Sequence, residues 1–166
     1  NSLPRIVSLP PPPSLSPGLH VLMEKPFTTD VQEARMLAAA VDSGGERVFL
    51  VNHSANARPQ AEIAAAAVAE GRIGEVQHVT AFMGSALAWL FEDLEQKNWN
   101  EPSGAMVGNG FGWGQMSHLL AWIFLVTGLE PLRVTCALGH SGITGADLYN
   151  SATIVCENGA TVALSG

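Results

Sequence analysis

A short apolar run that ends at a proline constrains the fold of this chain more than any other segment. Residues 21–23 are apolar and lie between Gly18 and the triplet Glu24-Lys25-Pro26. This length and these flanks predict a strand buried on both faces of a parallel sheet. Pro26 has no backbone N–H and disfavours the helical region for Lys25, so the strand ends there. Glu24 and Lys25 then lie where open α/β sheets bind ligands, although a solvated surface pair is the commoner meaning of such a triplet.

The residues after the triplet complete a strand-helix-strand unit. Thr29 and Gln32 form a capping pair, apolar residues follow at helical spacing, and Gly44-Gly45 ends the helix. Residues 48–51 then predict a second buried strand, which we expect to be parallel to the first with a right-handed crossover. The unit at 18–52 is therefore predicted to be the edge of a larger doubly wound sheet.

The rest of the chain, residues 53–166, predicts an α+β arrangement in which helices pack on a mostly antiparallel sheet. The strongest local signal is Asn158-Gly159, which is typical of the turn of a hairpin between two strands. Because the chain ends inside the strand after this turn, we expect an unpaired sheet edge, an uncovered face and self-association. The expected elements are a helix from Pro59 to Gly71, a strand at 75–83, a loop with a single helical turn at 84–103, a buried helix at 115–127, and strands at 132–138, 149–156 and 160–164.

The composition excludes several classes of partner. Charged residues make up 14% of the 166 residues, well below the usual ~25%, which indicates that another domain or subunit covers much of the surface. The formal net charge is −7 and the eight lysines and arginines are scattered, so we expect no nucleic-acid partner. Two distant cysteines predict neither disulfides nor a zinc site, and no apolar run is long enough to cross a bilayer. We therefore expect a cytoplasmic protein without membrane contact or bound metal.

Residues 1–17 have a different character from the rest of the chain. They contain the run from Pro10 to Pro13 and a further proline at Pro17, which together predict an extended, disordered tail. A P-x-x-P ligand for an SH3-like module is the functional alternative. A splice or gene-model artefact is the other alternative.

Three motifs resemble, in the same order, those of one oxidoreductase family. They are Glu24-Lys25-Pro26, residues 71–76 (Gly-Arg-Ile-Gly-Glu-Val) and residues 117–120 (Ser-His-Leu-Leu). The stretch from 18 to 166 is thereby similar to the Gfo/Idh/MocA oxidoreductases, which are sugar and cyclitol dehydrogenases. The resemblance implies NAD or NADP as cofactor, a polyol or sugar with a secondary alcohol or its ketone as substrate, and a homo-oligomer.

The resemblance also implies a division of the chain. Residues 18–52 would be the remnant of a Rossmann-type dinucleotide-binding domain, and residues 53–166 would be part of a C-terminal domain for substrate binding and oligomerisation. The family's glycine-rich phosphate loop should precede this remnant, but residues 1–17 carry no such loop. Because dinucleotide binding rests on that loop, we expect residues 1–166 alone to bind little NADH or NADPH. A non-catalytic fragment that serves folding or subunit association is therefore the alternative to an enzyme.

By the same resemblance, two residues carry the chemistry. Lys25 would polarise the reacting oxygen, and His118 would exchange its proton as hydride leaves the same carbon. On the residues alone, a lone histidine in an apolar helix is more often a core residue. The family's aspartate four residues before this histidine is Gly114 here, which leaves its supporting role to Gln115 or Asn109. The implied cofactor-binding residues are Glu24, Lys25 and Pro26, and the implied substrate-binding residues are Arg58, Asn109 and Gln115.

The remaining candidate features have less specific meanings. Glycines at every second position from Gly108 to Gly114 do not fit a dinucleotide fingerprint, because no clear strand precedes them. They predict either the wall of a substrate pocket or a plain loop. Without the resemblance, Arg58 simply precedes a helix. Three other histidines, His53, His78 and His140, have no spacing that suits a metal ion, so structural or surface roles are expected for them.

Overall fold

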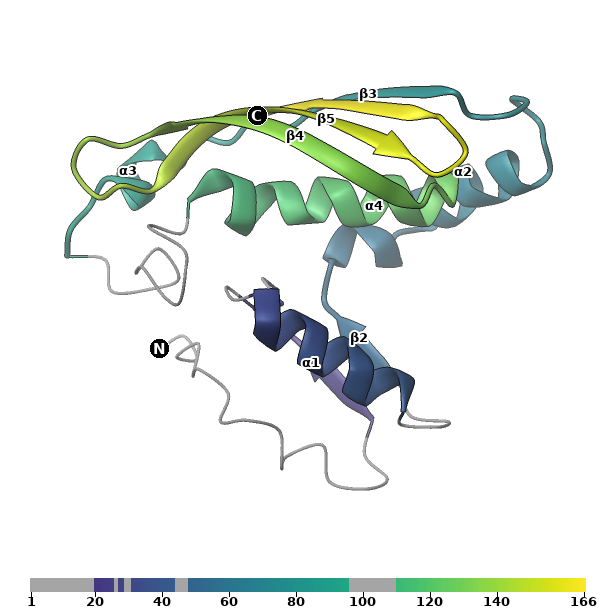
Figure 1. Ribbon diagram of the computed structural model, residues 1–166, viewed down its shortest axis with the longest axis horizontal. Helices are drawn as coiled ribbons and strands as arrows, with labels where there is room; N and C mark the ends of the chain where they lie inside the picture. Colours follow the sequence, from purple (N-terminus) through teal and green to yellow (C-terminus); the bar gives the residue numbers. More distant parts are fainter. Residues whose placement is uncertain (1–19, 26, 29–30, 44–47, 96–109) are drawn as a thin grey trace.

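The protein has two layers of unequal size in a computed structural model (Figure 1). The larger layer is a four-stranded sheet with helices along one face, and the smaller one is a strand-helix-strand unit below those helices. A parallel sheet followed by a mostly antiparallel sheet with helices confirms the predicted fold class. The structure describes residues 20–25, 27–28, 31–43, 48–95 and 110–166.

The smaller layer consists of β1 (Val21–Met23), α1 (Val31–Asp42) and β2 (Phe49–Val51). The two strands are parallel, as predicted, because Val21 pairs with Phe49 and Met23 with Val51. The predicted burial on both faces is wrong, since Leu22 is 71% and Leu50 57% exposed. Residues alternate between the two faces of a strand, and no described residue covers the face that carries these two leucines. One face of this small sheet is therefore open.

The start of α1 differs from the predicted capping pair. Thr29 lies outside the described residues, and the hydroxyl of Thr28 donates to the Glu33 carboxylate at 2.8 Å. Along α1 the half-buried positions are Ala34, Leu37, Ala40 and Val41, which recur at the three- and four-residue spacing of one helix face. The predicted amphipathic helix is thus confirmed, although none of its side chains is fully buried.

Two short helices and a strand follow β2. A 3₁₀ turn, η1 (Ser54–Ala57), leads into α2 (Pro59–Ala69), which begins at the predicted proline. The helix ends two residues before Gly71, which has φ +68°. Strand β3 (His78–Phe82) is shorter than the predicted 75–83. In the predicted loop at 84–103 there is one helical turn, α3 (Ala88–Phe91), while residues 96–103 lie outside the described part.

The predicted buried helix exists, but it begins earlier than its apolar pattern indicates. A π-helical turn, η2 (Gly112–Met116), leads into α4 (Ser117–Thr127). The second half of the glycine run is therefore the start of a helix and not a plain loop, while its role as the wall of a substrate pocket stays a prediction. Gly128 ends the helix with φ +66°, where its N–H donates to the Phe124 carbonyl. Only Ile123 and Val126 of α4 are fully buried.

The larger sheet has the strand order β3-β6-β5-β4, with β4 at Pro131–His140, β5 at Asp147–Cys156 and β6 at Thr161–Ser165. Strands β4, β5 and β6 are antiparallel neighbours, whereas β3 pairs with β6 in parallel. The predicted hairpin at Asn158-Gly159 is confirmed, with Gly159 at φ +85°. The predicted unpaired edge is present among the described strands, but it is not at the last strand, because β6 lies between two partners. The edges of the sheet are β3 and β4.

One face of the sheet forms the core with α4, and the other face is open. Alternate residues of β5 and β6 point into the core, where Ile154, Cys156, Val162 and Leu164 pack with Ile123 of α4. Figure 1 shows no helix on the opposite face, so the predicted uncovered face is present among the described elements. Its exposed side chains on β3 and β5 are His78, Thr80, Phe82, Tyr149, Ser151 and Thr153.

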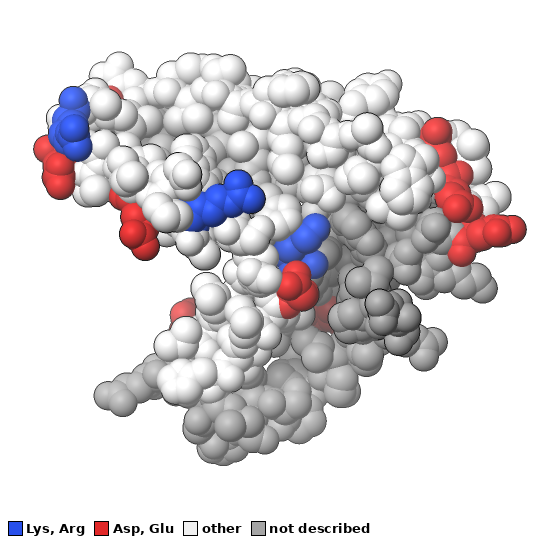
Figure 2. Space-filling model, turned by 180° about the vertical axis from the view of Figure 1, so that it is seen from behind, with Lys and Arg blue, Asp and Glu red and all other residues white. Residues whose placement is uncertain are grey.

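The surface carries few charges. Figure 2 shows the Lys, Arg, Asp and Glu side chains of one side in small separate groups, with wide uncharged areas between them. This distribution agrees with the low charged fraction of the sequence. Within the described residues, no helix is long and apolar enough to span a membrane.

Candidate functional site

The carboxyl ends of β1 and β2 lie side by side and carry the first polar groups of the site. Asn52, directly after β2, donates its side-chain N–H to the Glu24 carboxylate at 2.6 Å. Lys25 follows Glu24 and extends its ammonium to the carbonyl oxygen of Gly114 at 2.9 Å. Burial lowers the pKa of the Lys25 ammonium below its usual 10.5, while the negative charge of Glu24 acts in the opposite direction. This lysine therefore bridges the smaller layer and the helix that carries His118.

The π-helical turn that receives Lys25 is held by a buried carboxylate. Asp147, the first residue of β5, accepts the backbone N–H of Gly110 at 3.0 Å with one oxygen and that of Gly112 with the other. The two glycines are needed for this approach, because a Cβ on Gly110 would lie 1.9 Å from the Asp147 carbonyl oxygen. π-helical turns are often found at functional sites. Here the turn ends immediately before α4, so it sets the position of the first turn of α4, which carries His118.

His118 lies in the first turn of α4 and packs against a second histidine. The ring centroids of His53 and His118 are 5.4 Å apart, and the rings meet edge to face at 86°. Burial lowers the pKa of His118 below 6.5, and the positive charges of Lys25 and then His53 lower it further, with Glu24 acting against them. The pKa of His53 is lowered by burial and then by Lys25. Both imidazoles are thus held toward their neutral forms.

The structure places the other predicted site residues in different ways. Gln115 is half-buried within the π-helical turn, next to Gly114. Arg58 is exposed at the N-terminal cap of α2, where its carbonyl accepts the N–H of Ala61. Pro26 and Asn109 lie outside the described residues. The Lys25 ammonium donates to the main-chain carbonyl of Gly114, and the supporting role of Gln115 or Asn109 stays a prediction.

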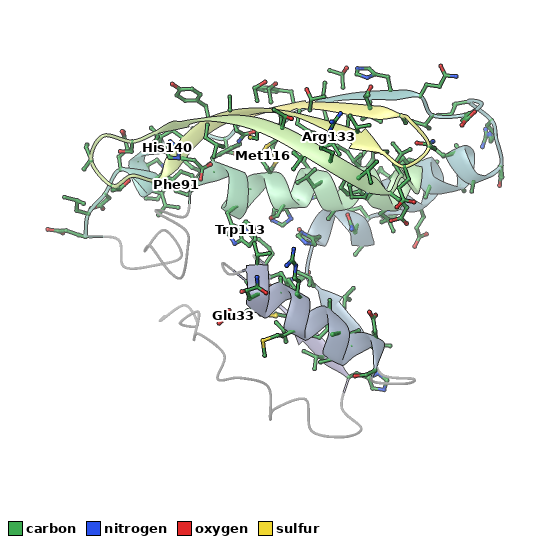
Figure 3. The ribbon with its side chains drawn as sticks, viewed as in Figure 1. Glu33, Phe91, Trp113, Met116, Arg133 and His140 are labelled. Carbon is green, nitrogen blue, oxygen red and sulfur yellow. The ribbon has the colours of Figure 1, made fainter. Side chains whose placement is uncertain are left out.

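Several polar atoms around His118 are buried and make no hydrogen bond within the described part of the chain. They include Nδ1 of His53, Nε1 of Trp113 and the hydroxyl oxygen of Ser117. In Figure 3 the Trp113 side chain points away from the sheet and toward the strand-helix-strand unit, whereas Met116 points to the sheet. Because buried polar groups are nearly always paired, these atoms need hydrogen-bond partners that the described residues do not supply. The described residues contain no group of three or more possible metal ligands.

Sequence reasoning missed two residues of this region. It assigned His53 a structural or surface role, whereas the ring lies against His118. It also did not identify Asp147, because no sequence pattern indicates a contact with Gly110 and Gly112, which lie 37 and 35 positions earlier. The signal for His53 was its position directly after a predicted parallel strand, at the same sheet edge as Lys25. The expectation for His78 agrees with the structure, where it is exposed and bonds Thr161 and Thr80.

Comparisons with known proteins identify the kind of scaffold that carries this site. The uncharacterised oxidoreductase YdgJ of Escherichia coli (strain K12) is 30% identical over 140 residues, which are 83% of this chain and 38% of that protein. The chain spans 38–40% of the length of the two curated relatives it matches.

Solved structures of relatives share the fold. The crystal structure of the oxidoreductase domain protein from Kribbella flavida superposes with a TM-score of 0.71 at 24% identity, over 89% of this chain and 42% of that chain. The apo scyllo-inositol dehydrogenase from Lactobacillus casei gives a TM-score of 0.65 at 17% identity, over 89% of this chain and 42% of that one. At these identities the two structures show the fold alone.

A family model assigns the chain directly. The model of the GFO/IDH/MocA C-terminal domain matches residues 62–166, a span that includes α4 with His118 and the whole four-stranded sheet. This match confirms the resemblance seen in the three short motifs. Because it covers more than half of the sequence, the chain belongs to the GFO/IDH/MocA family.

Proposed function

We propose that this chain carries the substrate side of an NAD(P)-dependent oxidoreductase site that acts on a secondary alcohol of a carbohydrate-like molecule, or on its ketone. One observation supports the proposal above the others. The hydrogen bond from the Lys25 ammonium to Gly114 places a cation one helical turn before His118, although the two residues come from different layers. A cation and a neutral imidazole side by side are the groups that the oxidation of an alcohol requires.

Each side chain would have a separate role in the reaction. Lys25 would donate a hydrogen bond to the reacting oxygen and stabilise the negative charge that develops on it. His118, kept neutral by burial and by Lys25, would take the hydroxyl proton as the C–H bond breaks. The chemistry that a nicotinamide would supply here is that of a hydride acceptor for this carbon, with which the alcohol would become a ketone. In the reverse direction His118 would return the proton.

The residues at the carboxyl ends of β1 and β2 fit such a cofactor. Glu24 and Asn52 form a polar edge there, joined by their hydrogen bond, and ligands of open α/β sheets bind at this end of the strands. Glu24, Lys25 and Pro26 would therefore lie beside the cofactor. We also propose that residues 18–52 belong to a dinucleotide-binding domain and residues 53–166 to a domain for substrate binding and association, with residues 1–17 as a separate tail.

A polyol or sugar is the substrate class that we propose. The support comes from three buried polar atoms near His118, on His53, Trp113 and Ser117, for which the described residues supply no hydrogen-bond partner, because a ligand with several hydroxyls would pair them. The names of two solved relatives, which are scyllo-inositol and myo-inositol dehydrogenases, agree with this class. Arg58, Asn109 and Gln115 remain proposed substrate contacts. Cys136 and Cys156 are free thiols, so we place the protein in the cytoplasm.

The open face of the larger sheet supports a role in association as well. It presents Phe82, which is 74% exposed, and Tyr149, which is 65% exposed, among small Ser, Thr and Ala side chains. Arg133 of β4 lies on this face, because its partner Val155 points outward. Among the described strand residues of this face, it is the only Lys, Arg, Asp or Glu. We propose that two copies of the chain pack through this face. Association of this kind is also the alternative to catalysis for the chain taken by itself.

A hybrid enzyme tests the proposed activity. Residues 18–166 would replace the matching part of YdgJ, so that a complete dinucleotide-binding half precedes them, and reduction of NAD or NADP would be followed with inositols and sugars. Lys25→Met and His118→Gln should each lower turnover by roughly 100-fold or more, the usual scale for a positioned acid-base group. The control is His140→Gln, because His140 is exposed at the end of β4. Undiminished turnover of either site variant would refute the assignment.

A further inference from the structure

The backbone around His53 fixes the position of its ring. His53 lies between β2 and η1, where its N–H donates to the Val51 carbonyl at 2.8 Å and its own carbonyl accepts the N–H of Asn56 at 2.8 Å. The side-chain amide of Asn56 in turn donates to the carbonyl of Ala121 at 3.4 Å. Since Ala121 is three residues after His118 on α4, this contact holds η1 against the turn that carries His118.

The two rings are close enough for a proton on one to affect the other. Their centroids are 5.4 Å apart at an interplanar angle of 86°, an arrangement that is favourable for aromatic rings. Two positively charged imidazoles at this distance and partly out of water would repel each other, because like charges disfavour each other's charged forms. Nδ1 of His53 is buried and unpartnered within the described residues, so no described acceptor there would stabilise a proton on it.

The charged groups around the pair come mainly from the end of β1. Lys25 opposes a positive charge on either ring, and Glu24 partly offsets that effect at His118. The sequences of η1, the π-helical turn and the first turn of α4 contain no ionisable side chain besides His118. The first turn of α2 contributes Arg58 and Glu62, which are both exposed.

We propose that His53 and His118 are a coupled pair, in which a proton on one imidazole excludes a proton from the other, so that His53 helps to set the pH range in which His118 is a neutral base. The coupling itself needs no substrate or cofactor. The statement that His118 acts as a base rests on the proposed function. His53 is in this view a positioning residue, since it acts through His118.

Titration of the histidine rings by nuclear magnetic resonance tests the coupling in the 166-residue chain. In the unsubstituted chain the two rings should titrate in two steps that both resonances report, as expected for coupled groups. His53→Gln should raise the midpoint of His118, and His118→Gln should raise the midpoint of His53. The shift of His118 should be the larger one, because His53 lowers the pKa of His118, whereas the pKa of His53 is lowered by burial and by Lys25. His140→Gln serves as the matched control and should move neither midpoint.

Some results would overturn the coupling. Independent single-step titrations in the unsubstituted chain would refute it even if a variant failed to fold. An unchanged His118 midpoint in folded His53→Gln would also refute it, because the charge on His53 would then have no effect on His118. In the hybrid enzyme, His53→Gln should move the midpoint of the pH–rate profile upward. The control His140→Gln should leave that midpoint in place. A hybrid without activity but with coupled rings would refute the proposed function alone.

Discussion

Asp147 is a residue whose replacement we expect to have a large effect on stability. Its side chain is 7% exposed and accepts two backbone N–H groups, from Gly110 and Gly112, in front of the helix that carries His118. Asp147→Ala leaves both N–H groups without their acceptor. An unsatisfied buried donor costs about 1–3 kcal/mol, so the variant should lose about 2–6 kcal/mol of the free energy of unfolding. Asp147→Asn keeps one acceptor oxygen and should lose about half as much.

Urea unfolding followed by circular dichroism measures this effect. The matched control is Asp42→Ala, because Asp42 is an exposed aspartate at the end of α1 and should change the free energy by less than about 0.5 kcal/mol, as surface substitutions usually do. If Asp147→Ala were as stable as this control, the two hydrogen bonds would not hold the π-helical turn. If Asp147→Asn were as damaging as Asp147→Ala, loss of charge and not loss of acceptors would be the cause.

Three further predictions follow from particular groups. The folded chain lowers the pKa of His53 and His118 below the ordinary 6.5, so the unfolded state binds more protons. The free energy of unfolding should therefore fall as the pH drops below about 6.5. Urea unfolding at several pH values should show a weaker fall in His53→Gln, and an unchanged fall would contradict the pKa shifts. Gly159→Ala should cost about 1 kcal/mol or more by the same assay, because Gly159 has φ +85°, whereas Gly142→Ala, at a site without a close neighbour or positive φ, should cost less. Cys136 should react slowly with iodoacetamide near neutral pH, because burial and the charge of Asp147 raise its pKa, and Asp147→Asn should speed the reaction; equal rates would argue against that charge effect.

The local parts of the fold could be read from the sequence. The parallel strand-helix-strand unit, the proline at the start of α2 and the Asn158-Gly159 hairpin depend on residues close together in the chain, and the structure has all three. The strand order could not be read in the same way. Strand β6 joins β3 in parallel across the length of the domain, and no local pattern distinguishes that partner from another. The open face at Leu22 was missed because an apolar run does not show what covers it.

The candidate site likewise has one part that local sequence motifs predict and one part that they do not. Lys25 and His118 were predicted because they belong to motifs, and the structure brings them to neighbouring positions through Gly114, while their catalytic roles remain predictions. His53 and Asp147 belong to no motif. Their contacts with His118 and with the two glycines exist only after distant segments have packed. The π-helical turn was also not predicted, because alternate glycines do not by themselves indicate the start of a helix.

The central position of β6 has a consequence for synthesis of the chain. Strand β3 pairs only with β6 among the described strands, and the paired residues His78 and Thr161 are 83 positions apart. Ribosomes add about 5–20 residues per second, so β3 waits roughly 4–17 s for its partner. The antiparallel strands β4 and β5 can pair within that interval, because only a short loop separates them. The nascent chain therefore passes through a stage in which Phe82 and the edge of β3 have no strand to bind, and this stage is where a chaperone would be most useful.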